Sequence, residues 1–280
     1  MKKSDLEKLQ IEEIEVLDEI VRICDKNNIP YFLAAGTLLG AIRHSGFIPW
    51  DDDIDIFMLR DDYNKFIECA INEIDDKFFL QCHETDREYY SSFIKVRKNN
   101  TLMIEKENEN RKSHRGIWVD IFPLDYVKGD SKFLKFKVFL SKLLKGAIFI
   151  KIKYLPFKKI RHRYLALPFC ILSNDLLHYL SNNLLISKRE YAYLANLSGI
   201  YPYNKELIPV EKVFPSKKIM FHNKEYTCFN DCDYYLKRLY GNYMELPKKE
   251  DRVNHNISKI SFSEGDIFIT KEQIMLYKKR

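Results

Sequence analysis

The aspartates of the run Phe-Ile-Pro-Trp-Asp-Asp-Asp-Ile-Asp-Ile, residues 47–56, are the side chains best suited to do chemistry. In a strand, Asp53 and Asp55 share one face, whereas Ile54 and Ile56 occupy the other face. Neighbouring carboxylates repel one another. A hard divalent cation removes that repulsion, and Mg²⁺ favours one or two carboxylates together with phosphate oxygens. The alternation with isoleucine therefore predicts a metal and phosphate site in preference to a solvated acidic loop.

The segment before the aspartates predicts how they are positioned. Residues 31–35 are typical of a short strand, Gly36 and Thr37 break it, and residues 38–43 predict a short helix. A glycine lets the backbone approach a ligand, and amides at a helix N-terminus suit phosphate. Nucleotidyltransferase sites have this layout: a strand, a turn, a short helix and a second strand that carries aspartates.

A third carboxylate is expected from the apolar run at residues 116–123, where Asp120 is the acidic residue. A charge in such a strand is costly unless a cation faces it, although bonds to loop amides are the alternative. We therefore predict Asp53, Asp55 and Asp120 as the catalytic, metal-binding set, with Asp51 supporting them.

Cationic and aromatic side chains are expected to hold the substrate. Arg43 follows the glycine turn, and Lys95 and Arg97 share a strand face from which both could reach one diphosphate. The alternative for this pair is a solvated outer face. His44 could bind phosphate or cap the short helix. Trp50 is expected to pack under the acidic loop in preference to stacking on a base or a quaternary ammonium.

Several motifs along the chain resemble the LicD family, the bacterial phosphocholine transferases related to fukutin-type transferases. The matching segments are residues 36–44, 46–56, 95–97 with Thr101, 119–125, 235–244 and 246–247, Arg252 and His255. The resemblance implies a nucleotidyltransferase-like fold and a divalent metal, Mg²⁺ or Mn²⁺. It also implies transfer of a phosphorylated small alcohol, first of all phosphocholine, from a CDP-activated donor to a hydroxyl of a cell-surface glycan such as lipopolysaccharide, teichoic acid or capsule. It leaves the roles of Arg252 and His255 open.

Three other functions are considered for these residues. A nucleotidyltransferase that adds a nucleotide to RNA or protein would need the same three carboxylates, and Asp120 could accept the proton of the attacking hydroxyl in either case. A non-catalytic glycan- or membrane-binding relative would be expected to have lost one carboxylate. A metal-dependent phosphohydrolase is disfavoured, because such sites usually include histidines.

The rest of the chain predicts an α+β fold, in which a nucleotidyltransferase-like mixed sheet is flanked by helices and the C-terminal half is mainly helical. The 280 residues, 46% of them hydrophobic, are divided into a catalytic core at 1–130 and a region at 131–280 that completes the site. Ser4 and Glu7 predict a capping box, and Asp125 predicts a turn or cap. Six cysteines without a disulfide spacing and an N-terminus without an apolar leader predict a cytoplasmic protein with reduced thiols.

Positive charge is concentrated at residues 131–174, which contain eleven Lys or Arg and no acid, against a net charge of +6 for the whole chain. The first part of this segment, 131–163, predicts a basic amphipathic helix of the kind that lies on anionic membrane surfaces, at the inner face of the cytoplasmic membrane. Recurring lysines exclude a transmembrane span. A helix with solvated lysines is the alternative, and no nucleic-acid partner is expected.

Overall fold

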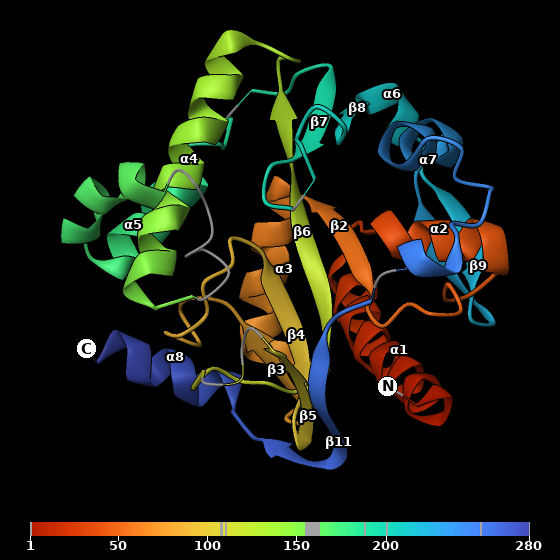
Figure 1. The fold of residues 1–280 in the computed structure, drawn as a ribbon, viewed down its shortest axis with the longest axis horizontal. Coiled ribbons are helices and arrows are strands. Elements are labelled where there is room, and N and C mark those ends of the chain that lie inside the picture. Colours follow the sequence, from red (N-terminus) through yellow and green to blue (C-terminus); the bar gives the residue numbers. More distant parts are fainter. Residues whose placement is uncertain are drawn as a thin grey trace.

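The computed structural model describes residues 2–106, 109, 111–154, 163–187, 189–199, 201–252 and 254–279. Figure 1 shows a mixed sheet with helices around it, which confirms the predicted α+β class. In chain order the elements are α1 (Lys3–Asn27), β1 (Phe32–Leu33), α2 (Ala35–His44), β2 (Asp55–Leu59), α3 (Arg60–Glu73), β3 (Phe78–Gln81), β4 (Ile94–Lys98), β5 (Thr101–Glu105), β6 (Trp118–Val127), α4 (Lys132–Lys151), η3 (Arg163–Ile171), α5 (Asn174–Asn183), β7 (Tyr193–Asn196), β8 (Leu207–Pro209), α6 (Val210–Val213), β9 (Lys217–Phe221), β10 (Lys224–Cys228), α7 (Cys232–Tyr240), η4 (Lys249–Asp251), β11 (Ile257–Asp266) and α8 (Thr270–Lys278).

The central sheet follows the order β1-β2-β6-β4-β3, and β7 and β8 extend it from the far end of β6. Strands β2 and β6 run parallel, and the other pairs in this sheet are antiparallel. Strand β6 is the longest of the sheet, because its first half pairs with β4 and its second half with β7. Two strands from the second half of the chain therefore belong to the core sheet, and the division at residue 130 stays a prediction.

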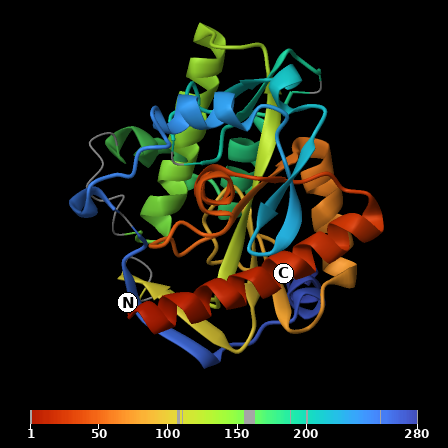
Figure 2. The same cartoon turned by 90° about the vertical axis from the view of Figure 1, so that its right-hand side faces the viewer.

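Helix α1 closes one side of the molecule and runs across the whole view in Figure 2. Its buried side chains, which include Leu9, Val16 and Ile20, recur at helical spacing and bury an apolar stripe against the core. Two glutamates of α1, Glu13 and Glu19, are also buried, and Glu13 is 1% exposed.

The two predictions about helix starts were wrong. Helix α1 begins at Lys3, so Ser4 lies inside its first turn, and the N-cap Lys2 makes no side-chain cap bond. Helix α2 begins at Ala35, so Thr37 lies inside the helix and not in a turn before it. The Thr37 hydroxyl accepts a hydrogen bond of 2.8 Å from the Asp55 backbone N–H, which ties the first turn of α2 to β2.

Asp125 is neither a turn nor a cap, which corrects the prediction from sequence. It lies within β6 and is 1% exposed. Its two oxygens accept hydrogen bonds of 2.8 and 2.7 Å from Nε and Nη2 of Arg60, the first residue of α3. The carboxylate therefore fixes the start of α3 against the sheet.

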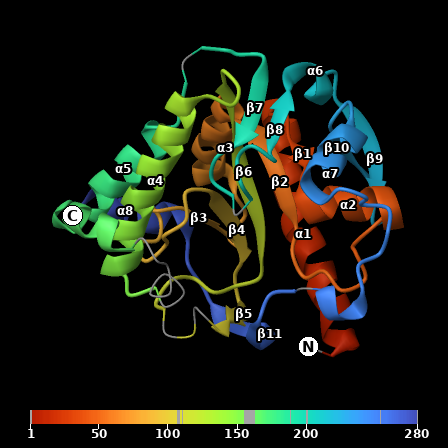
Figure 3. The ribbon, with the colours of Figure 1, turned by 45° about the horizontal axis from the view of Figure 1, so that its top comes forward.

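The second half of the chain lies on both sides of the sheet. Helices α4 and α5 pack together with η3 on one side, and the β9–β10 hairpin and α7 lie with α2 on the other (Figure 3). The predicted strand-rich patch near residues 208–229 is confirmed by β8, β9 and β10. Among the helices that the structure describes, none has the length and apolar character required to cross a bilayer.

Candidate active site

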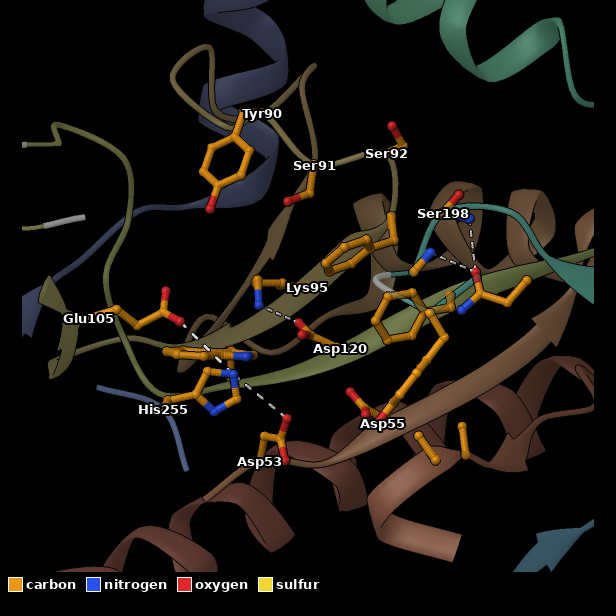
Figure 4. Close-up of a pocket in the computed structure, with 18 of the residues that line it drawn as sticks. Asp53, Asp55, Tyr90, Ser91, Ser92, Lys95, Glu105, Asp120, Ser198 and His255 are labelled. Carbon is orange, nitrogen blue, oxygen red and sulfur yellow. Dashed lines mark hydrogen bonds and ion pairs between the residues drawn. The ribbon is translucent and has the colours of Figure 1, made fainter. Parts of the chain in front are cut away.

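Three neighbouring strands carry the charged side chains at the centre of the candidate site. Asp55 of β2 is the register partner of Asp120 on the parallel strand β6, and Lys95 of β4 is the partner of Asp120 on its other side. Side chains at paired positions of a sheet lie side by side on one face. Lys95 Nζ lies 2.5 Å from Asp120 Oδ1, and Figure 4 shows both side chains beside Asp55. The sheet register thus brings together carboxylates that are 65 residues apart in the sequence.

These side chains line a cavity of about 990 Å³. Its floor is formed by the ends of β2, β4 and β6, and its walls come from the acidic loop, from α4, and from the loops after β3 and β7. The predicted site residues that line it are Gly36, Trp50, Asp51, Asp53, Asp55, Lys95, Arg97 and Asp120. Ile54 and Ile56 are fully buried on the other side, so the alternation predicted for residues 53–56 is confirmed.

His255 lies against the acidic loop, which contains Asp51, Asp52 and Asp53. Its backbone N–H donates to both oxygens of Asp52 at 3.1 Å, and its Nδ1 lies 3.0 Å from Asp52 Oδ1. Its Nε2 lies 3.9 Å from one oxygen of Asp53 and 3.9 Å from one of Glu105, as the dashed lines of Figure 4 show. Burial opposes the charged ring, but the bond to Asp52 and the charges of the acids raise the pKa of His255 to about 10. His255 is therefore a cation held among three carboxylates.

The surroundings of the other acids of the site destabilise their ionised forms. Burial raises the pKa of Asp51, Asp53 and Asp55, and repulsion from neighbouring aspartates raises it further. Burial and the same aspartates also raise the pKa of Glu13, whose Oε2 has no hydrogen-bond partner. A site of this kind gains stability from an added cation.

The donor set fits a hard divalent ion. Carboxylate oxygens are the ligands that Mg²⁺ and Mn²⁺ prefer. Asp53, Asp55 and Asp120 line one cavity, but their carboxylate oxygens do not all lie within 4.8 Å of one another. Among the described residues, the three-residue group whose ligand atoms all lie within 4.8 Å of one another is Asp52, Asp53 and His255. The assignment of Asp53, Asp55 and Asp120 as ligands stays a prediction.

The structure gives Gly36 and Trp50 definite positions beside the acidic loop. A Cβ at Gly36 would lie 2.9 Å from Asp51 Oδ2, so glycine permits this close approach. Trp50 packs against the core, as predicted, and the guanidinium of Arg252 covers its ring at 4.2 Å from the centroid. One face of the Trp50 ring is thus occupied by a cation of the protein itself, Arg252.

Arg43 and His44 lie outside the described lining of the cavity. Arg43 Nη1 donates to the Tyr243 carbonyl at 2.9 Å, and its Nε donates to His44 Nε2 at 2.9 Å. Burial, and then the neighbouring Arg43, lowers the pKa of His44. The structure therefore shows these two side chains bonded to each other and to the backbone near α7, and their contact with phosphate stays a prediction.

Arg97 lines the cavity, and hydrogen bonds fix its guanidinium in place. It is 8% exposed, its Nη1 donates to the Gly116 carbonyl at 2.6 Å, and its Nε donates to the Gln81 side chain. Both Lys95 and Arg97 lie over the ring of Trp118, at 4.3 and 4.8 Å from its centroid. The solvated outer face considered for this pair is therefore wrong, since both cations are directed inward.

A mixed sheet that presents paired carboxylates from two parallel strands, with a lysine beside them and a helix α2 before them, is the arrangement of a nucleotidyltransferase-type transferase. The family model described as LicD/FKTN/FKRP, nucleotidyltransferase domain, matches residues 28–169. The chain is 30% identical over 273 residues to the lipopolysaccharide cholinephosphotransferase LicD of Haemophilus influenzae, which covers 92% of this chain and 98% of that protein. Shorter matches are found to uncharacterized proteins of Rickettsia typhi, 43% identical over 20% of this chain and 18% of that protein, and of Rickettsia prowazekii, 46% identical over 17% and 18%.

The chain belongs to the LicD family. This confirms the predicted membership and supports the predicted class of enzyme, a phosphotransferase of the LicD type. The match of the family model extends from just before β1 to η3, so it includes both the acidic loop and Asp120.

Proposed function

We propose that this protein transfers phosphocholine from a CDP-activated donor to a hydroxyl of a cell-surface glycan, with Mg²⁺ or Mn²⁺ held by Asp53, Asp55 and Asp120. The observation that carries the proposal is the paired position of Asp55, Asp120 and Lys95 at the floor of a large cavity. It is supported by the relative named as a lipopolysaccharide cholinephosphotransferase, which matches nearly the whole chain.

Each side chain has a role that its position allows. The bound ion would neutralise charge on the donor phosphates and on the departing CMP. Lys95, directed into the cavity above Trp118, supplies a further positive charge for a phosphate oxygen. Asp120 lies beside Lys95 at the centre of the sheet, where its carboxylate accepts the proton of the acceptor hydroxyl. Most of the rate gain in such a site comes from fixed charges and from orientation of the two substrates.

The experiment that tests this proposal is product analysis by mass spectrometry. Purified protein is incubated with Mg²⁺, lipopolysaccharide and one CDP-alcohol at a time, namely CDP-choline, CDP-ribitol or CDP-glycerol. We expect CMP release and a glycan that gains the mass of phosphocholine, only when CDP-choline and the metal are both present. Incorporation of a nucleotide into RNA or protein from ATP or GTP, without transfer from any CDP-alcohol, would replace the proposal by the nucleotidyltransferase alternative.

We also propose that the reaction takes place at the cytoplasmic face of an anionic membrane, on which the protein lies through α4, η3 and α5. Among the described residues, ten of the seventeen exposed large apolar side chains lie on these three elements. They are Phe133, Phe136, Phe139, Tyr164, Leu165, Leu167, Ile171, Leu176, Tyr179 and Leu180. We call this set the α4–α5 surface.

Charge on this surface complements an anionic membrane. Helix α4 carries six lysines and no acid, and three exposed phenylalanines follow one another at intervals of three residues. Phe139 of the α4–α5 surface also lines the cavity, as does Lys142, so this surface adjoins the cavity. A lipid-linked glycan held at the membrane would therefore lie beside the site. Residues 155–162 of the predicted segment lie outside the described residues.

A further inference from the structure

The wall of the cavity contains a second group of side chains that were not predicted as site residues. Asn196, Ser198 and Gly199 come from the end of β7 and the loop after it, and Tyr201 and Glu206 lie between that loop and β8. In the view of Figure 4, Ser198 lies beyond Asp55 and Asp120 on the side away from His255 and Glu105. The cavity thus has a part that is separate from the acidic loop.

Glu206 is the notable side chain of this part, because it is an acid that is only 2% exposed and yet lines the cavity. The structure gives it an uncharged hydrogen-bond partner, the Asn196 side chain. Burial raises the pKa of Glu206 to about 8, and the bond from Asn196 opposes this only in part. Glu206 is therefore mostly protonated near pH 7 without a ligand, and a positively charged ligand beside it would favour its ionised form.

The loop after β7 is built around this carboxyl. Asn196 Oδ1 accepts hydrogen bonds from the backbone N–H groups of Ser198 and Gly199, at 2.9 and 3.0 Å, which leaves its amide group for Glu206. A Cβ at residue 199 would lie 2.5 Å from Asn196 Nδ2 and 3.0 Å from Glu206 Oε1. Glycine at this position is therefore required by the close packing of Asn196 and Glu206, and the carboxyl is held in place.

Two tyrosines, Tyr201 and Tyr240, line the same cavity near Asp55. The rings of Tyr201 and Tyr240 are perpendicular, with an interplanar angle of 89° and centroids 6.0 Å apart, and their hydroxyl groups are 3.4 Å from each other. Both are half-buried and both line the cavity. The charge of Asp55 acts on both tyrosines, and the charge of Glu206 acts on Tyr201 and Tyr235, so these groups lie near one another.

A perpendicular pair of aromatic faces beside a buried acid is suited to one class of ligand. A quaternary ammonium donates no hydrogen bonds, and it is bound through aromatic faces and a nearby negative charge. A phosphate or a diphosphate would be repelled by the ionised form of Glu206, and a neutral polyol could hydrogen-bond to this carboxyl but would not compensate its charge. Trp50, the other aromatic ring considered for an ammonium, is already covered by Arg252.

From this arrangement we infer that Glu206, Tyr201 and Tyr240 form the binding subsite for the cationic head group of the donor. The inference rests on the proposed function, because it concerns binding of the same donor. The metal and the cations would hold the phosphates of the donor, and the subsite would hold its ammonium group. The phosphorus next to the head group would then face Asp55, and the cationic group would supply a positively charged partner, which Glu206 does not have among the described residues. Tyr201 and Tyr235, the titratable groups whose charge interacts with that of Glu206, are neutral near pH 7, since burial raises the pKa of each.

The test measures KM and kcat of Glu206→Gln, which keeps the shape of the side chain and its bond to Asn196 but removes the charge. With CDP-choline we expect KM to rise about tenfold and kcat to change less than twofold, because the head group is held equally in ground state and transition state. With CDP-glycerol, a donor with a neutral head group, KM should stay unchanged. Glu211→Gln on the neighbouring helix α6 is the matched control, since Glu211 is exposed and lies outside the cavity.

A second pair of variants separates ring contact from structural support. Tyr201→Phe keeps the aromatic face and should keep KM for CDP-choline, whereas Tyr201→Leu should raise it. Equal rises in KM for choline and glycerol donors in Glu206→Gln would show a structural role and overturn the subsite. A preference of the wild type for CDP-glycerol over CDP-choline would also overturn the subsite, but it would still support transfer from CDP-alcohols.

Binding of phosphocholine alone, followed by calorimetry, keeps the two proposals distinguishable. Binding to the wild type that is lost in Glu206→Gln would support the subsite even if no CDP-alcohol were turned over, in which case the proposed function would fail. No binding of phosphocholine to the wild type would overturn the subsite.

Discussion

The carboxyl groups of Asp53 and Asp55 face one cavity and repel each other, so the residue-scale prediction concerns their charge. We expect Asp53→Asn and Asp55→Asn each to lower the transfer rate at least about 100-fold, as loss of one electrostatic partner of the reacting groups does. Without metal, the melting temperature should stay equal or rise by a few degrees, because each change relieves repulsion. Thermal melting with and without Mg²⁺ and an assay of CMP release measure both effects.

Asp61→Asn is the control for this prediction, since Asp61 is exposed at the start of α3 and lies outside the cavity. Mg²⁺ should raise the melting temperature of the wild type and of this control, but not of the two site variants. Full activity of either site variant, or of the wild type in EDTA, would contradict the metal assignment.

Residues differ in how far their role can be predicted from sequence. The position of Asp53 and Asp55 at one cavity could be predicted from their alternation with the buried Ile54 and Ile56, whereas their role as metal ligands stays a prediction. Asp120 could be predicted as the acid in a buried strand. The position of His255 against Asp52 could not, because it joins segments 203 residues apart without a local pattern. Glu206 gave no signal either, since an isolated glutamate is most often a surface residue.

At the scale of elements, the bond between Arg60 and Asp125 joins α3 to β6, and this pair carries the next prediction. Asp125→Asn leaves the guanidinium of Arg60 partly buried without its charge partner, and we expect a loss of about 3–5 kcal/mol in the free energy of unfolding. The double variant Arg60→Leu with Asp125→Leu should recover most of that loss, because no buried charge is then left unpaired. Urea denaturation of the wild type, Asp125→Asn and the double variant measures both differences in the free energy of unfolding.

The exposed pair Lys3–Glu7 on α1 gives the matched control. Its side chains are 89% and 61% exposed, so Glu7→Gln should change the free energy of unfolding by less than about 1 kcal/mol. A loss for Asp125→Asn no larger than for Glu7→Gln would show that the buried pair does not hold α3 on the sheet.

Element starts were predicted less well than element types, for a physical reason. Sheet strands and the long helices follow from hydrophobic period, which many residues determine together. The start of α2 instead depends on one tertiary hydrogen bond, from the Asp55 N–H to the Thr37 hydroxyl, and the start of α1 lies one residue before Ser4. Asp125 lies two residues after Pro123, and this position predicts a turn. In the structure Asp125 lies within β6 and accepts a hydrogen bond from Arg60.

At the scale of the whole molecule, apolar exposure and positive charge are concentrated on the α4–α5 surface. Each lysine near an anionic membrane contributes on the order of 1 kcal/mol, and inserted phenylalanines add apolar burial. Lys145 is not one of the exposed lysines of α4, because it is half-buried beside the cavity, and burial, Lys142 and Arg60 lower its pKa to about 8. The membrane-facing charges of α4 must therefore be tested at its N-terminal half.

The last prediction concerns the variant that combines Lys132→Glu, Phe133→Ser, Phe136→Ser and Lys137→Glu. These residues lie outside the cavity, and a glutamate in the first turn of a helix is compatible with the helix dipole. We expect the wild type to sediment with vesicles that contain anionic lipid and to be released by salt, and the variant to bind at least about tenfold more weakly. Transfer to a soluble fragment of the acceptor should be unchanged, because the catalytic residues are untouched.

The matched control removes the same kind of apolar exposure elsewhere, through Ile11→Ser on α1 with Met244→Ser after α7, at side chains 60% and 57% exposed. This control should bind vesicles as the wild type does, since neither residue belongs to the α4–α5 surface. Equal binding of the wild type to neutral and anionic vesicles would exclude the lysines as the cause of membrane binding. If neither kind of vesicle binds the protein, then α4 is an ordinary helix with solvated lysines, and the acceptor must reach the cavity from solution.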